Sequence, residues 1–568
     1  ARLAEGMMVA VKNFRSRSAA SAKENIQSFT VMVVSRIWPL HYGLSGLDDS
    51  HYYPLQMEVI EQAVPDWDTD DESSMMIHMS AVPINYDLVI GPDGEIEFTK
   101  GFSYPLLGAK AYIVNHETVN SIYNKRVREA LGFTKKFTSP DPRKDPRLGL
   151  LRMFEDPNTE IPVYVDLHKL IRYHFGVFSF TGGGKSNLIS NIVRRVLFHT
   201  TDTKVVIFDI SCEYPFLLCD VVADDGLRSC VVLEEEVANA EQFSCSVVKP
   251  RKFEDDPLAN KALEDLYNKK RVVHYNREAG DVPSFGSLLA DMMYMRDGID
   301  RITYLEAADT IRGFVKDYMK EHNKSEKDEL DENFIDELDR FSKRTMEEYA
   351  VHEKAALYAW GTTRHKMKDS LRRAREAVRT GVTVGDIVNM LKGEERLICI
   401  SIAEPSILRD IVVKLTESAL GLRKREFTVK PQILFVFDEA QEFIPQYVSE
   451  DLRRCSHAVE RLLRQGRKYG LGGAIATQRV AHLNTNVLQQ LHTFFVGTLP
   501  RPYDRSVVSN SFQIDITMMD KTLEFPPGSW LLSSYVATGL DNVPLFIRAD
   551  NVEEAIGAHL KQFRGASQ

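Results

Sequence analysis

The stretch HFGVFSFTGGGKSNLISNI, residues 174–192, decides how the rest of the chain is interpreted. Aromatic and β-branched residues come first, three glycines follow, and an apolar helical pattern begins after the lysine. Because residues 182–184 lack Cβ atoms, successive backbone N–H groups can point inward and surround a phosphate. Lys185 is placed to reach the β- and γ-phosphates, and the Ser186 hydroxyl is placed to ligate Mg²⁺. The sequence therefore predicts a strand, a phosphate-binding loop and a helix.

One position departs from the strict phosphate-loop pattern G-x-x-x-x-G-K-[ST]. The pattern has glycine six residues before the lysine, where this chain has Ser179. Serine is small, and a strand is expected before the loop and a helix after it. We therefore interpret the stretch as a nucleotide site for ATP rather than as a glycine-rich turn. The candidate nucleotide-binding residues of the loop are Thr181, Gly182, Gly183, Gly184, Lys185, Ser186 and Asn187.

Two adjacent carboxylates, Asp438 and Glu439, follow an apolar run in the segment FVFDEAQEF. A lone acidic pair most often marks the place where a strand ends in solvent. Near a nucleotide, however, Asp438 is suited to hold the Mg²⁺ shell, and Glu439 to polarise the water that attacks the γ-phosphate. The pair therefore indicates an NTP hydrolase rather than a kinase.

Three further segments end apolar runs on polar side chains: FDISCEY, AIATQRV and LLRQGRKYGLGG. The first contains Asp209 and Glu213. The second contains Gln478, which is placed to sense the γ-phosphate and orient the water, and the third presents Arg467 and Lys468 beside glycines. Taken singly, each is explained more simply as ordinary loop polarity. Their places at successive strand ends, where ligands bind in open α/β sheets, favour a shared nucleotide site.

The order of the patterns predicts an α/β fold, a RecA-like P-loop core with a parallel sheet, preceded by a small antiparallel β-barrel or sandwich and interrupted by a helical insertion. A length of 568 residues is too great for one hydrophobic core. We expect an N-terminal extension (1–26), the barrel (27–125), a linker (126–160), the first part of the core (161–250), the insertion (251–394), the second part of the core (395–545) and a C-terminal tail (546–568).

The composition is that of an ordinary globular protein, with 43% hydrophobic and 27% charged residues. No run of 18 apolar residues occurs, which argues against a membrane span. The six cysteines form no CxxC pair, so reduced thiols in a cytoplasmic protein are expected and a zinc site is not. The net charge of −10 does not by itself favour nucleic-acid binding, although a ring can still line its channel with basic residues.

The segments FTGGGKSN, FDISCEY, FDEAQEF and GRKYGLGGAIATQR together resemble the HerA–FtsK branch of P-loop ATPases, most closely the archaeal HerA helicases and translocases. The β-rich region ending in YPLLGAKAYIVNHETV is similar to the small barrel ahead of HerA ATPase cores. The resemblance implies that Lys185, Asp438, Glu439, Gln478 and Arg467 serve hydrolysis with ATP and Mg²⁺.

The same resemblance implies further site residues and partners. Asp209 and Glu213 match an acidic pair near the nucleotide, and Arg172 matches a phosphate-contacting arginine. The family forms homohexameric rings that move double-stranded DNA and commonly work with the nuclease NurA in DNA end resection. Candidate DNA contacts are the basic segments RRAREAVRT (372–380), LRKREF (422–427) and RPYDR (501–505), each of which is more simply a solvated basic surface.

Two other functions use the same core. One is a secretion or conjugation motor of the VirB4/TrwB type, and the other is a defence ATPase that regulates a partner nuclease. The segment DEAQ also stands where DEAH is frequent in the HerA family, which suggests a divergent member.

Overall fold

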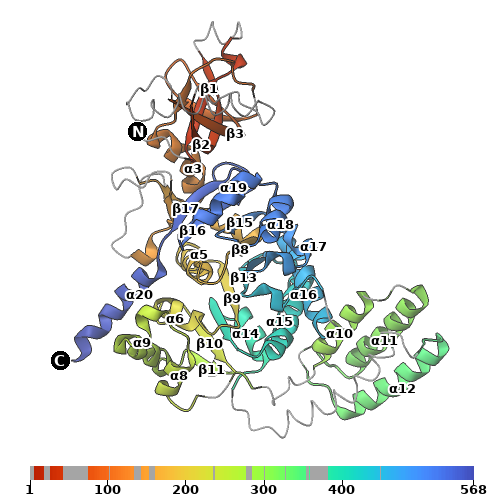
Figure 1. Cartoon of the computed structure of the whole chain (residues 1–568). Coiled ribbons are helices and arrows are strands. Elements are labelled where there is room, and N and C mark those ends of the chain that lie inside the picture. Colours follow the sequence, from red (N-terminus) through yellow and green to blue (C-terminus); the bar gives the residue numbers. More distant parts are fainter. Residues whose placement is uncertain are drawn as a thin grey trace, which may run out of the picture. The chain divides into compact units, whose positions relative to one another are not determined.

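In the computed structural model the chain forms two compact units, which are described separately (Figure 1). The first consists of residues 1–201, 439–441 and 474–555, and the second of residues 202–438, 442–473 and 556–568. The structure describes residues 5–17, 26–41, 75–101, 103–132, 142–152, 160–234, 237–276, 284–297, 299, 301–326, 328–352, 357, 381–447 and 450–567.

A small antiparallel sheet with strand order β4-β3-β2-β1-β5 begins the first unit. Its strands are β1 (Met8–Lys12), β2 (Gln27–His41), β3 (Met75–Ile90), β4 (Ile96–Lys100) and β5 (Ala111–Ile113). Alternating apolar side chains such as Val9, Val31 and Val33 are buried, as expected for a sheet with one covered face. Helix α3 (His116–Ala130) follows the sheet.

The large sheet of the first unit has the order β14-β8-β15-β16-β17-β6-β7. Strand β8 (Phe175–Phe178) is parallel to β14 (Leu471–Thr477) and to β15 (Thr493–Val496), and all of its residues are buried. The antiparallel strands are β16 (Ser529–Ser534), β17 (Leu545–Ala549), β6 (Gly149–Leu151) and β7 (Pro162–Val163). The helices are α4 (Leu167–Arg172), α5 (Lys185–His199), α17 (Thr485–Leu488), α18 (Pro502–Phe512) and α19 (Ile516–Lys521), and α20 (Val552–Leu560) begins here.

The second unit contains an entirely parallel sheet with the order β11-β10-β12-β9-β13. Its strands are β9 (Thr203–Asp209), β10 (Ser229–Leu233), β11 (Val272–His274), β12 (Leu397–Ser401) and β13 (Gln432–Phe437). The connecting helices are α6 (Tyr214–Leu217), α7 (Cys219–Val222), α8 (Ala240–Ser246), α9 (Pro257–Asn268), α14 (Val384–Lys392), α15 (Pro405–Glu426) and α16 (Glu450–Gly466). Continuous apolar runs form the inner strands because helices cover both faces of such a sheet.

In the described residues between β11 and β12, helices α10 (Phe285–Asp297), α11 (Ile302–Glu321) and α12 (Glu332–Glu348) share a hydrophobic core of their own, and they are green in Figure 1. The Phe334 ring packs 4.7 Å from that of Phe285 and 4.6 Å from that of Tyr318, measured between centroids. The expected α/β fold class, with parallel strands, a small β-sheet domain ahead of them and a helical interruption, is confirmed.

Several elements differ from the expected domain boundaries. Strand β1 lies in the expected N-terminal extension, yet it pairs with both β2 and β5 and is an inner strand of the small sheet. Strand β6 lies in the expected linker, and β17 extends into the expected tail, although the two pair with each other. Strand β11 lies in the expected insertion but pairs with β10. All are strands of only three to five residues, which local periodicity does not identify.

In the described part of the chain, no helix combines the length and the apolar character needed to cross a bilayer.

Candidate nucleotide site

The phosphate loop joins the buried strand β8 to helix α5 in the first unit. Gly182 and Gly184 have φ angles of +83° and +96°, a region in which residues with a Cβ atom are strained. Gly184 is the N-cap residue of α5, and its carbonyl accepts the backbone N–H of Leu188 at 2.9 Å. The glycines therefore shape the loop at the positive end of the helix, where an anion is stabilised.

Lys185 is folded back against its own loop. Its Nζ atom donates to the carbonyl oxygens of Ser179 at 3.3 Å and Phe180 at 3.4 Å, and its side chain is 7% exposed. Both hydrogen bonds are longer than the usual N–H···O range, so phosphate oxygens can replace these two acceptors at little cost. The same Nζ atom lies 3.9 Å from Oε1 of Glu439.

Ser179, the departure from the strict glycine pattern, is fully buried beneath the loop. Its hydroxyl lies 3.5 Å from the carbonyl oxygen of Thr498. A Cβ atom added at Gly183 would collide with this hydroxyl, and one added at Gly497 would lie 2.6 Å from it. Serine therefore fits at this position because two of its neighbours have no side chain.

Glu439 occupies an unusual backbone conformation. Its φ angle is +47°, in the left-handed region that residues with a Cβ atom rarely adopt. Its Oε1 atom faces Lys185, and its Oε2 atom accepts a hydrogen bond from Nε2 of Gln441 at 2.8 Å. Strain of this kind persists where the surroundings fix it, and it is concentrated at functional sites.

Gln478 is brought to the phosphate loop by strand β14. Its Oε1 atom accepts a hydrogen bond from the hydroxyl of Thr181. The backbone N–H of Ser179 also donates to the carbonyl oxygen of Thr477 at 3.3 Å, so the end of β14 borders the loop. The first unit thus assembles Lys185, Glu439, Gln478 and Thr181, four of the residues singled out from the sequence.

The second unit places Asp209 and Asp438 after neighbouring parallel strands, and both are buried. The backbone N–H of Asp438 donates to the carbonyl oxygen of Phe208 at 3.3 Å. Oδ2 of Asp209 accepts from the Ser401 hydroxyl at 2.6 Å and from the backbone N–H of Tyr214 at 3.1 Å. Burial raises the pKa of Asp209 to about 6, although these two hydrogen bonds act in the opposite direction.

Three other predicted site residues lie at ends of helices in the second unit. Glu213 is the N-cap residue of α6 and is half-buried. Arg467 and Lys468 form a short 3₁₀ turn, η6 (Arg467–Tyr469), directly after α16, and both side chains are exposed. Gly470 ends this turn with a φ angle of +68°. An exposed arginine in a glycine-bounded turn is suited to contact another molecule.

The residues present fit a nucleotide with Mg²⁺. The glycine loop leaves space at Gly182, where an added Cβ atom would meet nothing within 4 Å. Within the first unit, Ser186, in the first turn of α5, offers a hydroxyl oxygen of the kind that Mg²⁺ prefers. The described residues include no group of three or more His, Cys, Asp or Glu side chains that could hold a metal.

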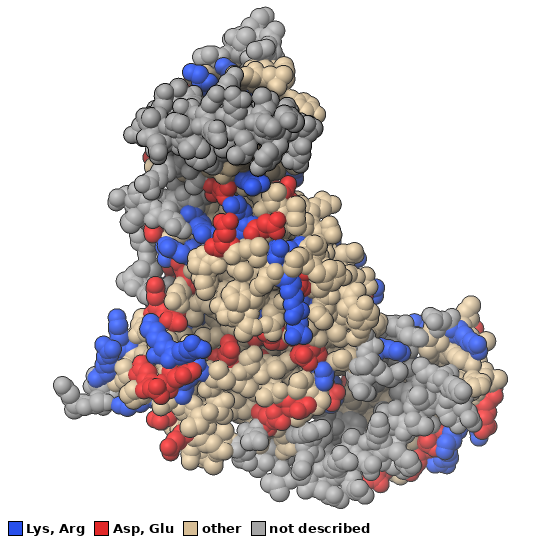
Figure 2. Space-filling view, viewed as in Figure 1, with Lys and Arg blue, Asp and Glu red and all other residues tan. Residues whose placement is uncertain are grey.

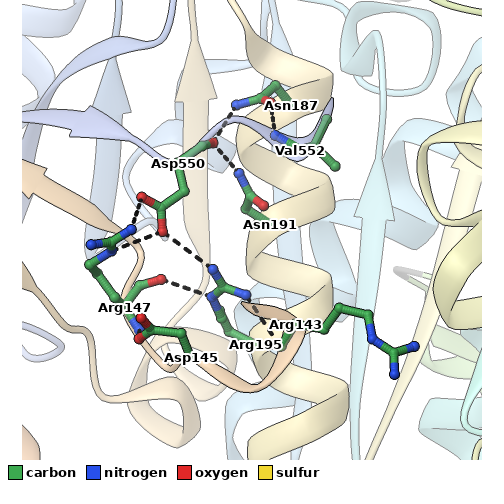
Figure 3. Close-up of polar contacts among 8 residues, drawn as sticks. All are labelled: Arg143, Asp145, Arg147, Asn187, Asn191, Arg195, Asp550 and Val552. Carbon is green, nitrogen blue, oxygen red and sulfur yellow. Dashed lines mark hydrogen bonds and ion pairs between the residues drawn. The ribbon is translucent and has the colours of Figure 1, made fainter. Parts of the chain in front are cut away.

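Asn187 points away from the loop, toward the C-terminal part of the first unit (Figure 3). Its Nδ2 atom donates to the carbonyl oxygen of Asp550 at 3.0 Å, and its Oδ1 atom accepts the backbone N–H of Val552 at 2.7 Å. The carbonyl of Asp550 also accepts from Asn191. Both polar atoms of the Asn187 side chain are thus engaged with the protein, and its contact with nucleotide stays a prediction.

The Asp550 carboxylate lies between two arginines, as Figure 3 shows. Arg147 approaches it at 3.0 Å and Arg195 at 3.3 Å. Arg195 is 5% exposed and also donates to the carbonyl oxygen of Arg147 at 2.8 Å. This network links α5, the helix that follows the phosphate loop, to the segments around Arg147 and Asp550. Sequence analysis missed it because its members are separated by hundreds of residues and form no local motif.

Two of the basic segments considered for DNA are engaged within the chain. Arg423 donates to the Thr428 hydroxyl at 2.9 Å, and Arg425 pairs with Glu326. Arg505 donates to the carbonyl oxygen of Leu499 at 2.8 Å. The segment 372–380 lies outside the described residues.

Charge on the visible surface is mixed rather than segregated. Figure 2 shows Lys and Arg side chains interspersed with Asp and Glu over the described part of one face. The described part of this face therefore does not identify a continuous basic surface for DNA.

Comparisons with known proteins indicate a family of helicases. Residues 148–420 match the family model described as "Helicase HerA, central domain". A probable helicase of Methanocaldococcus jannaschii is 22% identical over 364 residues, which cover 61% of this chain and 57% of that relative. The DNA double-strand break repair helicase HerA of Pyrococcus furiosus is 23% identical over 434 residues, which cover 71% and 69%. This chain therefore spans a little over half to about two thirds of the length of these relatives.

Among solved structures, VirB4 of Thermoanaerobacter pseudethanolicus is similar over 74% of this chain and 100% of its own, with 13% identity and a TM-score of 0.40.

Proposed function

We propose that this chain, which belongs to the HerA family of P-loop ATPases, hydrolyses ATP and uses the free energy to move along double-stranded DNA. The observation that carries the proposal is the 3.9 Å distance between Nζ of Lys185, at the end of the glycine loop, and Oε1 of Glu439. A cation suited to phosphate and a carboxylate suited to act on water are thereby combined in one site.

Binding requires the loop to exchange internal contacts for contacts with phosphate. Its backbone N–H groups surround the phosphates, and Lys185 exchanges two backbone carbonyls for phosphate oxygens. Ser186 and Asp438 are the residues proposed to hold Mg²⁺, which neutralises charge on the phosphates when it is bound.

Hydrolysis requires a base and a group that orients water. We assign the base to Glu439, whose carboxylate is 23% exposed and therefore accessible to water. Gln478 bonds to Thr181 in the loop, so it is placed to respond to the γ-phosphate and to orient the attacking water. Arg467 is proposed to act on the site of a neighbouring subunit.

The DNA partner is inferred from the name of a relative, whereas the ring and the nuclease are inferred from the family resemblance alone. The protein of Pyrococcus furiosus carries the name DNA double-strand break repair helicase. We propose that this chain acts in the cytoplasm as a homohexameric ring on double-stranded DNA, together with a NurA-type nuclease in end resection and recombinational repair.

The rate of ATP hydrolysis with and without linear duplex DNA tests the proposal. The wild type is expected to hydrolyse ATP faster with DNA, whereas Lys185→Ala should lose hydrolysis by at least about 100-fold and bind nucleotide more weakly. Lys320→Ala, which removes an exposed lysine from α11, is the matched control and should behave as the wild type. Hydrolysis by Lys185→Ala at nearly the wild-type rate would contradict the site.

DNA binding should be sequence-independent and steeply dependent on salt, because a translocase contacts the phosphate backbone. The logarithm of affinity should fall with the logarithm of salt concentration by about 0.9 per phosphate neutralised. Hydrolysis that DNA does not stimulate, or binding that is specific in sequence and insensitive to salt, would argue for a motor or regulator of another class.

A further inference from the structure

Gln441 links the carboxylate of Glu439 to the end of strand β14. Its Nε2 atom donates to Oε2 of Glu439 at 2.8 Å, and its Oε1 atom accepts the Thr477 hydroxyl at 2.7 Å. The Thr477 hydroxyl in turn accepts the backbone N–H of Arg479 at 3.0 Å. An ordered series of hydrogen bonds thus connects the proposed base to the backbone on either side of Gln478.

The direction of this series is fixed by its two ends. An ionised carboxylate only accepts hydrogen bonds, so the amide of Gln441 must turn its NH₂ group toward Glu439. Its carbonyl oxygen then faces Thr477, which has a proton left to donate because its oxygen already accepts from Arg479. One donor and one acceptor on a neutral planar group satisfy both neighbours, whereas the reversed amide would turn its carbonyl oxygen toward the carboxylate of Glu439.

The surroundings make the arrangement rigid. Thr477 is fully buried at the end of β14, and its carbonyl oxygen accepts the backbone N–H of Ser179 at 3.3 Å. The positive φ angle of Glu439 requires contacts that hold it, and Gln441 supplies one from two residues further along the chain. The strand end therefore touches the phosphate loop on one side and orients Glu439 on the other.

We propose that Gln441 is a positioning residue that sets the orientation of the Glu439 carboxylate and links it to the strand end bearing Gln478. The base is then aligned by the same segment that contacts Thr181 in the phosphate loop. The inference rests on the proposed ATPase function and assigns a role to a side chain outside the residues proposed to contact nucleotide.

Loss of this contact should affect turnover rather than binding. A hydrogen bond to a charged group contributes enough free energy to change a rate by about 10- to 100-fold. For Gln441→Ala we expect kcat to fall by this factor, while KM for ATP and the affinity for ADP stay within about twofold of wild type. Gln489→Ala removes the same side chain type from an exposed position beyond β14 and should leave both constants unchanged.

Gln441→Glu distinguishes positioning from a merely structural role by its pH dependence. The introduced carboxylate repels Glu439 when ionised but donates a hydrogen bond when protonated. The activity of this variant relative to wild type should therefore rise as the pH is lowered from about 8 toward 6. Thr477→Val, which removes the hydroxyl but keeps the shape, should lower kcat, whereas Thr477→Ser should restore it.

The outcomes separate the inference from the function on which it rests. An inactive wild type, or an active Lys185→Ala variant, would overturn the ATPase proposal itself. The positioning role alone would be overturned if the wild type is active and both Gln441→Ala and Thr477→Val keep a kcat within twofold of the wild-type value. A parallel loss of nucleotide affinity in Gln441→Ala would also overturn it, because the role would then be structural.

Discussion

Lys185 and Glu439 are within ion-pairing distance, with 3.9 Å between the ammonium nitrogen and the nearer carboxylate oxygen. The lysine therefore has three acceptors, two backbone carbonyls and this carboxylate. A triphosphate competes for the same ammonium group with a larger negative charge. Binding should draw the lysine toward the phosphates and leave one oxygen of Glu439 available to a water molecule.

Glu439→Gln should separate nucleotide binding from hydrolysis. The substitution removes the charge that polarises water but leaves Lys185 and the proposed Mg²⁺ ligand Asp438 in place. We expect ATP affinity to be retained or increased and kcat to fall by at least about 100-fold. Equilibrium binding of a fluorescent ATP analogue and single-turnover hydrolysis measure the two effects, and unaltered turnover would remove Glu439 from the mechanism.

Asp550→Ala should destabilise the first unit. It leaves the guanidinium of Arg195, only 5% exposed, without its carboxylate partner, at a cost of about 2 to 4 kcal/mol. Asp541→Ala is the matched control, because Asp541 pairs with Lys100 and Arg126, both largely exposed, and its loss should change the unfolding midpoint much less. Thermal unfolding midpoints of both variants test this, and equal midpoints would show that the Asp550 network adds little stability.

The pH dependence of stability should contain a contribution from Asp209. Its pKa is raised by burial from 3.8 to about 6, so the folded state holds this proton more tightly than the unfolded state. The contribution to stability is fully present below about pH 4 and is lost as the pH rises through about 6. Asp209→Asn removes the titration, so its unfolding midpoint should exceed that of wild type by more at pH 8 than at pH 5, measured without nucleotide or metal. A difference that does not depend on pH would show that the carboxylate is not perturbed in this way.

Subunit mixing should reveal whether Arg467 acts on a neighbouring site. Lys185→Ala supplies an inactive site with an intact arginine, and Arg467→Ala supplies the reverse. If the arginine acts in trans, as arginine fingers that stimulate hydrolysis by on the order of 10³-fold do, mixed rings should regain ATPase activity. An activity no greater than the sum of the two separate variants would show that Arg467 acts within its own chain or only caps α16.

Sequence patterns located the features whose residues are contiguous. The phosphate loop was predicted because strand, glycines, lysine and helix follow one another, and the parallel strands because each is a continuous apolar run. Contacts formed by distant segments were not predicted. Nothing in DEAQ indicates that Gln441 bonds to Thr477, and nothing near Asn187 indicates Asp550, because both contacts depend on how the strands are ordered.

The packing around Ser179 restricts the order in which substitutions can be accepted. Its hydroxyl occupies space that a side chain at Gly183 or Gly497 would need. A serine can therefore enter position 179 only in a chain that already has both glycines, and afterwards neither glycine can change. Replacing Ser179 with glycine would remove the side chain that a Cβ atom at position 497 would meet first. A library that varies the three positions together should recover alanine at 497 chiefly in members with glycine at 179.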